Sequence, residues 1–289
     1  MTVDLTFRGR RLVSDRALVM AIVNRTPDSF FDRGATYADG AARDAVRAAI
    51  ADGADVIDVG GVKAGPGDEV DATEEIRRTV PFLAAVREEF PDAVLSIDTW
   101  RAEVGRQCAQ AGADIVNDTW AGADPALGDV AAEHGLGFVC SHTGGAVPRT
   151  RPHRVHYDDV VADVIAQTTT AADRLVARGV PREGILIDPT HDFGKNTWHG
   201  LELLRRVDEL VATGWPVLMA LSNKDFIGET LDRPVDGRRE GTMAATAIAA
   251  AAGAAMFRSH DVPGTLRVLE MSASIRGDRP PSRAVRGLA

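Results

Sequence analysis

Short apolar runs alternate with longer amphipathic segments along almost the whole sequence, and this alternation constrains the fold more than any other feature. Each run ends on polar residues or glycine, as buried parallel strands do. The runs occupy residues 17–24, 55–61, 94–99, 113–119, 137–142, 185–189, 217–222 and 255–260. Helices are predicted between them, among others at residues 41–52, 73–89, 157–178, 201–212 and 240–252. Eight strand–helix units predict an α/β fold in which a parallel eight-stranded sheet closes into a (β/α)8 TIM barrel.

An open, doubly wound sheet is the alternative arrangement for alternating strands and helices. Such sheets usually have fewer strands and a glycine-rich turn after the first one, whereas residues 24–27 read Asn-Arg-Thr-Pro. The 289 residues are 45% hydrophobic and suffice for one large core, so we assign residues 1–273 to a single barrel domain. Residues 274–289 lack apolar periodicity and are predicted to form a mobile polar tail. Residues 1–12 are predicted to form a short polar hairpin that plugs the bottom of the barrel.

Charge and cysteine content narrow the possible functions. The formal net charge is -9, which opposes nucleic-acid binding because that function needs a basic face. Cys108 and Cys140 lie in apolar contexts without disulfide or metal-ligand spacing, as is typical of a reducing compartment. The longest run of small apolar residues, 244–257, is interrupted by Gly253 and is too short to cross a bilayer. We therefore expect a cytoplasmic protein with neither nucleic acid nor membrane as a partner.

Polar side chains stand where the predicted strands end. In a TIM barrel these ends form one mouth, at which active sites are built. A single such residue is more often a turn or helix-cap residue, but here every strand supplies at least one. Carboxylates and an amide can bind the edge of a nitrogen-rich heterocycle, and cationic side chains can hold an anion. The strand ends therefore predict a flat ligand that carries phosphate. The residues are Asn24, Asp58, Asp98, Asn117, Asp118, His142, Asp188, Ser222, Lys224, Arg258 and His260.

Several longer motifs include these residues. Residues 24–30 read Asn-Arg-Thr-Pro-Asp-Ser-Phe, residues 58–61 read Asp-Val-Gly-Gly, and residues 222–228 read Ser-Asn-Lys-Asp-Phe-Ile-Gly. Shorter blocks follow in the same order and spacing at 98–99, 117–118, 188–189, 193–195 and 258–262. Over almost the whole barrel, the sequence therefore resembles the dihydropteroate synthase family.

The resemblance implies a reaction. Members of that family release pyrophosphate from 6-hydroxymethyl-7,8-dihydropterin pyrophosphate and join the pterin to the amine of p-aminobenzoate. Asp98 and Lys224 would be catalytic, with Asp98 stabilising the cation that is left when pyrophosphate departs. The family cofactor is Mg2+, for which Asn24 would be the protein ligand. By position, the pterin would be bound by Asp98, Asn117, Asp188 and Lys224, the pyrophosphate by Asn24, Arg258 and His260, and p-aminobenzoate by Phe193 and Ser222.

The resemblance also implies partners. The small-molecule partners would be the pterin pyrophosphate, p-aminobenzoate and the sulfa-type analogues that imitate it. A homodimer is implied as well, and the alanine-rich segment 243–252 is a candidate for close helix packing between subunits.

The sequence departs from the family pattern mainly around the pyrophosphate and p-aminobenzoate sites. The family motif Gly-Gly-Glu-Ser-Thr-Arg-Pro-Gly is replaced at residues 60–67 by Gly-Gly-Val-Lys-Ala-Gly-Pro-Gly, which puts Gly65 in place of an arginine. Asn223 replaces a second arginine, and Arg25 stands where a valine is usual. Residues 188–192 replace a glycine-rich stretch, so Asp192 adds a negative charge near the ligand.

Three interpretations follow from these departures. In the one we favour, the chain is a divergent second-copy paralogue that keeps the pterin-binding pocket but is weakly active or inactive. In the second, it is a fully active synthase of folate biosynthesis with rearranged loops, in which Arg25 or Lys63 replaces the lost charge. In the third, it is a pterin-dependent methyltransferase, because that chemistry shares the barrel and the pterin site.

Overall fold

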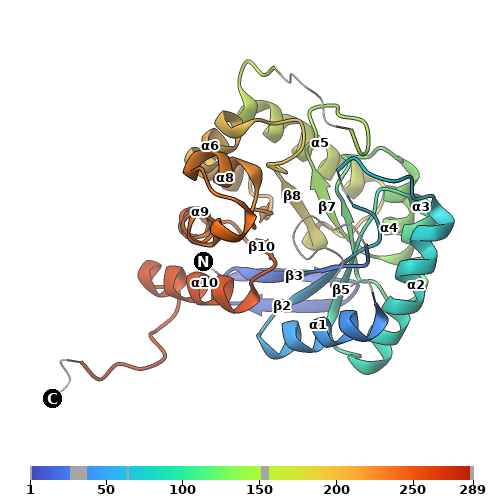
Figure 1. The fold of residues 1–289 in the computed structure, drawn as a ribbon, viewed down its shortest axis with the longest axis horizontal. Helices are drawn as coiled ribbons and strands as arrows, with labels where there is room; N and C mark the ends of the chain where they lie inside the picture. Colours follow the sequence, from blue (N-terminus) through green and yellow to red (C-terminus); the bar gives the residue numbers. More distant parts are fainter. Residues whose placement is uncertain (1, 27–37, 64, 151–155, 287–289) are drawn as a thin grey trace.

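The computed structural model describes residues 2–26, 38–63, 65–150 and 156–286 (Figure 1). Its main sheet has eight parallel strands in the order β8-β7-β6-β5-β4-β3-β10-β9. A parallel bridge between Ile187 and Val217 connects the two outer strands, so the sheet closes on itself as the predicted TIM barrel. The strands are β3 (Leu18–Asn24), β4 (Val56–Gly60), β5 (Val94–Asp98), β6 (Ile115–Asp118), β7 (Gly137–Ser141), β8 (Ile185–Asp188), β9 (Leu218–Met219) and β10 (Met256–Ser259).

Each of the eight predicted apolar runs contains one of these strands. The prediction works because the strands are buried on both faces and therefore read as continuous apolar stretches. Strand β9 is much shorter than the run 217–222, because the chain leaves the sheet after Met219 and turns at Asn223, where φ is +54°.

Helices surround the barrel, as Figure 1 shows. The predicted helix 201–212 is in fact two helices, because the backbone at Arg206 departs from helical geometry (φ -117°, ψ 26°). The last helix reaches Arg276, three residues into the segment assigned to the tail, and it ends at Gly277 in the left-handed conformation. The helices are α1 (Asp39–Ala51), α2 (Ala72–Glu89), α3 (Ala102–Gln110), α4 (Ala126–His134), α5 (Val160–Ala177), α6 (Thr197–Arg205), α7 (Val207–Ala212), α8 (Asp225–Leu231), α9 (Arg239–Ala252) and α10 (Val262–Arg276), with short 3-10 turns at Arg182–Gly184 and Val235–Gly237.

A hairpin of β1 (Val3–Phe7) and β2 (Arg10–Ser14) covers the N-terminal end of the barrel. Val3, Leu5 and Phe7 are buried in a cluster with the first residues of the barrel strands. The ring of Phe7 packs so closely on β7 that a Cβ atom at Gly137 would lie 2.4 Å from it. The predicted plug is therefore confirmed, but its inner face is apolar rather than polar.

The remaining core lies between the strands and the helices. Side chains such as Val46, Leu83 and Val104 pack from the helices onto the outer face of the sheet. The helices cover the outer face of the sheet, and the hairpin covers the N-terminal end of the barrel. The C-terminal mouth is therefore the open end. None of the helices in the described ranges is both long and apolar enough to span a membrane.

Candidate functional site

A cleft opens at the C-terminal mouth of the barrel, where the strand-end residues were predicted to meet. It encloses about 640 Å³ of empty space, including its open side. Most of the predicted site residues line this cleft, namely Asn24, Asp98, Phe193, Ser222, Lys224, Arg258 and His260. Asn117 and Asp188 are also at this end, but they are buried behind the lining side chains. A ligand can therefore contact Asn117 or Asp188 only if some of the lining side chains move.

Arg258 on β10 lies between two carboxylates. Its Nε donates to Asp58 Oδ2 at 2.6 Å, and its Nη2 donates to Asp98 Oδ2 at 2.8 Å. Asp58 is fully buried on β4 and also accepts hydrogen bonds from Ser96 Oγ at 2.6 Å and Asn117 Nδ2 at 3.2 Å. The guanidinium assigned to the pyrophosphate is thus engaged by the carboxylates of the barrel wall. Asp58 stood among the strand-end residues without an assigned role, and the structure places it at the centre of this network.

The second carboxylate in the network, Asp98, has an unusual environment. Its Oδ1 accepts a hydrogen bond from Thr119 Oγ1 at 3.0 Å. Burial raises the pKa of Asp98 above its usual range, although the Arg258 guanidinium opposes this shift. A carboxyl group in this state can accept or donate a hydrogen bond near neutral pH.

Asp188 at the end of β8 is held by the backbone. Its Oδ1 accepts a hydrogen bond from the Thr190 amide at 2.7 Å. Burial raises the pKa of Asp188 to about 6, while the Thr190 amide and the charge of Lys224 act in the opposite direction. Around neutral pH this carboxylate can accept hydrogen bonds from the N–H groups of a heterocycle.

Two further polar groups occupy the other wall of the cleft. Ser222 Oγ is hydrogen-bonded to His260 Nδ1 at 2.9 Å and accepts from the His260 amide at 3.3 Å. Burial lowers the pKa of His260 to about 3, and the charges of Arg258 and Lys224 add to this effect. The imidazole is therefore neutral at pH 7, and one of its two ring nitrogens carries a proton. It can bind an anion as a hydrogen-bond donor but not as a cation.

Lys195 connects two of the loops at the mouth. Its Nζ lies 2.8 Å from His142 Nδ1 and donates to the carbonyl oxygens of His142, Thr190 and Phe193 at 2.9, 3.2 and 3.0 Å. His142 Nε2 in turn lies 2.7 Å from Asp163 Oδ1 on α5. Burial lowers the pKa of Lys195 to about 7. The predicted site did not include Lys195, although it is one of only three lysines in the sequence.

Aromatic side chains form the rim next to Phe193. The Phe193 ring meets Trp120 edge to face at a centroid distance of 4.6 Å, and Trp120 meets Trp100 in the same manner at 6.4 Å. This arrangement fixes the Phe193 ring at the cleft surface, where it can pack on an aryl group. The nearby Asp118 has a structural role instead, because its oxygens accept hydrogen bonds from the backbone amides of Trp120 and Gly122.

The residues that depart from the family pattern do not restore the missing guanidinium groups. Arg25 is buried against the helices: it pairs with Asp39, its Nε contacts the carbonyl oxygen of Arg78 at 3.4 Å, and its guanidinium lies over the Phe82 ring. Arg25 is therefore not a substitute within the cleft, whereas Lys63 does line it.

Two hydrogen bonds to its backbone groups fix the position of Asn223. Its amide donates to Thr242 Oγ1 at 3.1 Å and its carbonyl accepts from Arg238 Nη1 at 2.9 Å. The left-handed conformation at this position suits asparagine better than most residues. A residue with a longer side chain at position 223 would thus be strained in this left-handed backbone conformation.

Within the described ranges, no group of three or more His, Cys, Asp or Glu side chains is placed to hold a metal ion. Asn24 lines the cleft, and its amide oxygen is the kind of hard ligand that Mg2+ accepts. Because Mg2+ is often held by one or two protein groups together with substrate phosphates, this residue fits an ion that arrives with a pyrophosphate.

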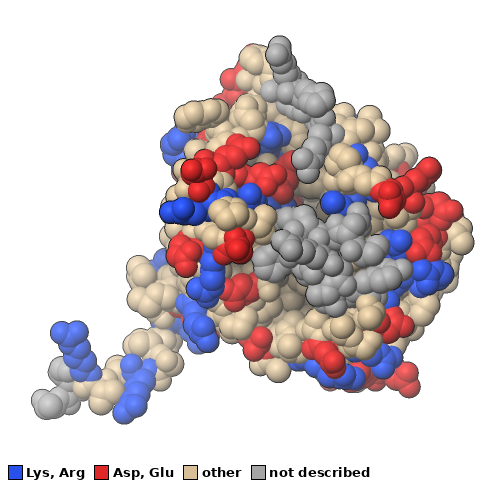
Figure 2. Space-filling model, in the orientation of Figure 1, with Lys and Arg blue, Asp and Glu red and all other residues tan. Residues whose placement is uncertain are grey.

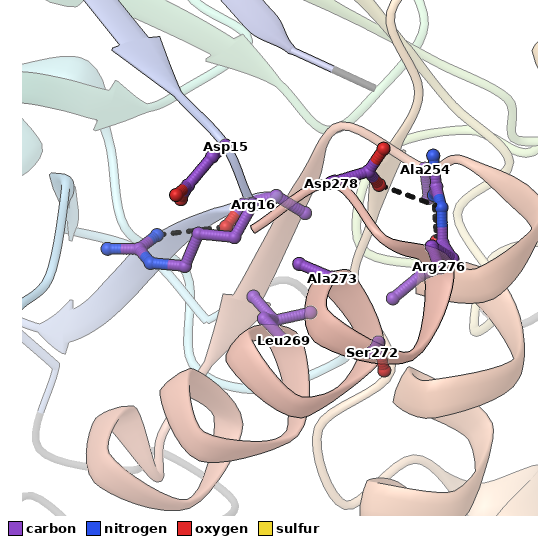
Figure 3. Close-up of a pocket in the computed structure, with 10 residues that line it drawn as sticks. Asp15, Arg16, Ala254, Leu269, Ser272, Ala273, Arg276 and Asp278 are labelled. Atoms are coloured by element: carbon purple, nitrogen blue, oxygen red, sulfur yellow. Dashed lines mark hydrogen bonds and ion pairs between the residues drawn. The ribbon is translucent and has the colours of Figure 1, made fainter. Parts of the chain in front are cut away.

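A second concavity lies at the opposite end of the barrel (Figure 3). It is bordered by α10 and by the segment that connects β2 to β3, and its lining includes Arg16, Ser272 and Arg276. Arg16 donates to the Ala17 carbonyl at 2.9 Å, and Arg276 donates to the Ala250 carbonyl at 2.7 Å. These arginines stabilise the start of β3 and the end of α9 rather than face a ligand. On the molecular face of Figure 2, acidic and basic side chains are interspersed.

Comparisons with known proteins agree with this geometry. The model of the family described as pterin binding enzyme matches residues 20–260. The protein named inactive dihydropteroate synthase 2 of Mycobacterium leprae is 66% identical over 285 residues, which cover 97% of this chain and 98% of that protein. Its namesake from Mycobacterium tuberculosis is 65% identical over 288 residues, with coverage of 98% and 91%.

Solved structures show the same fold. The dihydropteroate synthase of Yersinia pestis in complex with a sulfonamide drug superimposes with a TM-score of 0.89 at 35% identity, covering 96% of this chain and 100% of that one. The enzyme of Xanthomonas albilineans with 4-aminobenzoic acid gives a TM-score of 0.85 at 36% identity, with coverage of 96% and 99%.

Proposed function

This chain belongs to the pterin-binding enzyme family, as a homologue of dihydropteroate synthase, and from this membership we propose that it binds a pterin but condenses it with p-aminobenzoate weakly or not at all. The observation that carries the proposal is the double ion pair of Arg258 with Asp58 and Asp98. An arginine held by two carboxylates has little attraction left for a leaving pyrophosphate. Relatives with about two thirds of their residues identical are named as inactive, which supports the same conclusion.

The pterin-binding part of the proposal rests on the carboxylates and amide of the barrel wall. Asp98, Asn117 and Asp188 lie near the C-terminal ends of β5, β6 and β8, and Lys224, which immediately precedes α8, is near enough for its charge to lower the pKa of Asp188. Ionised carboxylates accept the hydrogen bonds that the amino and ring N–H groups of a pterin donate.

The part of the site that would bind pyrophosphate lacks several cationic side chains. Arg25 contacts the helices, residue 65 is glycine, residue 223 is asparagine, and His260 is neutral. In a transition state where pyrophosphate leaves, each missing guanidinium removes a charge-assisted hydrogen bond that would stabilise the developing charge. Mg2+ would supply part of this charge when bound, with Asn24 as the protein ligand.

We also propose the sites of the second substrate. The Yersinia and Xanthomonas structures contain a sulfonamide and 4-aminobenzoic acid, respectively, and in this chain Phe193 and Ser222 would border such an aryl ligand. A cytoplasmic location is proposed on the basis of Cys108 and Cys140, which are both free and buried.

The proposal is tested by calorimetric titration with 6-hydroxymethyl-7,8-dihydropterin pyrophosphate, followed by an assay of dihydropteroate formation with p-aminobenzoate and saturating Mg2+. We expect measurable binding of the pterin and very little product. An absence of pterin binding would contradict the proposed pocket, whereas rapid product formation would contradict the proposed loss of activity.

Pterin affinity should depend on pH. In the free protein Asp188 has a pKa of about 6, but only its ionised form accepts two hydrogen bonds from the pterin edge. Ligand binding must therefore release a proton from Asp188 at pH values below about 6. We expect the affinity for 6-hydroxymethylpterin to be roughly tenfold weaker at pH 5 than at pH 7. Calorimetry across this range measures the slope, and an affinity that is constant between pH 5 and pH 7 would show that Asp188 does not titrate on binding.

A homodimer is proposed on the basis of the surface of α9 and α10, which pack on each other. The alanine face of the segment 243–252 is buried inside the protomer, at Ala245, Ala249 and Ala250. The outward side chains Ile248 and Ile275 are large, apolar and 56% and 74% exposed, and they are better candidates for an interface. Sedimentation should show a dimer at micromolar concentration, and the double variant Ile248→Asp and Ile275→Asp should be a monomer. A monomeric parent protein would disprove this assembly.

One observation favours the alternative of a fully active synthase. Lys63 lines the cleft on the side where the family arginine is missing. A flexible ammonium group is a poor replacement for a planar guanidinium that binds phosphate through two hydrogen bonds, so we retain the first proposal.

A further inference from the structure

An ion pair between Lys224 and Asp192 lies at the edge of the cleft. Lys224 Nζ is 2.7 Å from Asp192 Oδ2, and the two side chains are 15% and 28% exposed. Lys224 is one of the cations that line the cleft, and Asp192 precedes Phe193, which lines it as well. The carboxylate of Asp192 therefore reduces the positive charge that this wall offers to a ligand.

The backbone fixes Asp192 in this position. Residues 190 to 193 form a tight turn in which the Phe193 amide donates to the Thr190 carbonyl at 3.1 Å. Lys195 donates to the carbonyl oxygens of Thr190 and Phe193, on either side of Asp192. Asp188 Oδ1 additionally accepts from the Thr190 amide. Because both ends of the turn are bonded to buried groups, the backbone holds the Asp192 side chain within reach of Lys224.

Lys63 also lines the cleft, and Lys195 is near enough to Asp192 for their charges to interact, but Arg258 and Asp188 do not offset the Asp192 charge. The Arg258 guanidinium already contacts Asp58 and Asp98, and the nearby Asp188 adds a further carboxyl group. A ligand carboxylate beside Phe193 would lie close to the Asp192 charge, and Lys224, which is paired with Asp192, would offset that charge only in part. In a partly buried site such repulsion is stronger than in water.

We propose that Asp192 is a specificity-determining residue, which selects against a carboxylate on the aryl group that packs beside Phe193. The cleft favours an aryl amine whose far end is uncharged, such as an amide. This inference rests on the proposed pterin-binding function and narrows the chemical class of the second ligand. It assigns to Asp192 a reason for poor use of p-aminobenzoate that is independent of the missing arginines.

The test compares two ligands that share a pterin group and differ in one charge, pteroic acid and its primary amide. Calorimetry gives the dissociation constant of each for the parent protein and for Asp192→Asn, which keeps the shape of the side chain and removes its charge. Relative to the amide, we expect pteroic acid to bind about tenfold more tightly to the variant than to the parent protein. Because both ligands carry the same pterin group, any effect of the substitution on pterin binding cancels in the ratio of their dissociation constants. Asp192→Ser serves as a second variant and should shift the ratio in the same direction.

Asp173→Asn is the matched control, because it removes one negative charge from an exposed position on α5. It should leave the ratio unchanged. A separate titration with 6-hydroxymethylpterin, which lacks the aryl group, tests the proposed function alone. If that pterin binds but the ratio stays the same in both Asp192 variants, the inference about Asp192 is wrong and the proposed function stands. If none of the three ligands binds, both fail.

Discussion

Replacing Asp188 with alanine should weaken the binding of 6-hydroxymethylpterin by roughly a hundredfold or more. Two hydrogen bonds from a pterin edge to an ionised carboxylate contribute about 1.5–3 kcal/mol each, and a tenfold change in affinity corresponds to about 1.4 kcal/mol. Asp188 is suited to this role because it is buried at the mouth and its pKa of about 6 leaves it ionised at pH 7. The measurement is calorimetric titration of the variant and the parent at pH 7.

The control for this prediction is Asp118→Asn. Asp118 is also buried at a strand end, and burial raises its pKa to about 6, but its oxygens bind the backbone amides of Trp120 and Gly122. This variant should bind the pterin as the parent does. Thermal unfolding of both variants will show whether either substitution disturbs the barrel. If Asp188→Ala binds the pterin as tightly as the parent, the assignment of the pocket is wrong.

The second prediction concerns the rate of dihydropteroate formation. Gly65 and Asn223 stand where two family arginines are expected, and a charge-assisted hydrogen bond contributes about 1.5–3 kcal/mol. If both bonds act on the transition state, their loss raises the barrier by roughly 3–6 kcal/mol, which slows turnover by about 10² to 10⁴. A product assay with saturating substrates and Mg2+ measures this rate. Turnover of about 1 per second or faster, as in ordinary metabolic enzymes, would refute the loss of activity.

The same assay can also show whether restoring the arginines raises the activity. The triple variant Ala64→Thr, Gly65→Arg and Asn223→Arg should form product faster than the parent. Ala64 lies outside the described residues, but the backbone at Asn223 is left-handed, so arginine there carries a cost of about 1–2 kcal/mol. The pair Ala64→Thr and Gly65→Arg should therefore also be tested without Asn223→Arg. Gly65→Gln is the matched control, because it adds a long polar side chain without the guanidinium charge.

The sequence predicts the architecture well because the relevant signals are local. A strand buried on both faces is a short apolar run, and polar residues or glycine stand at or just beyond its end at the mouth. All eight strands and their order around the barrel follow from this pattern. The same reasoning brings Asn24, Lys224 and Arg258 to one cleft, although they are far apart in the chain.

Other features depend on pairings between distant residues, which no local pattern reveals. Arg258 and Asp58 are 200 positions apart, and nothing in either neighbourhood indicates that the guanidinium lies over the barrel wall. The break between α6 and α7 is similar, because Arg206 leaves helical geometry where its side chain reaches Asp159, 47 positions earlier. Residues 201–212 have continuous helical periodicity, so the sequence predicts one helix there.

The hairpin at the N-terminal end of the barrel has a consequence for the order of events during synthesis. Residues 3–14 leave the ribosome before the barrel strands do, and β1 and β2 can pair at once because they are adjacent in the chain. The final position of Phe7 does not exist at that time, because its ring packs on Gly137 and Gly184. Until both have been made, Val3, Leu5 and Phe7 stay exposed to solvent or to other chains. The hairpin can thus form before the barrel strands are made, but it reaches its final place only after Gly137 and Gly184 have been synthesised, so later strands must cover its apolar face.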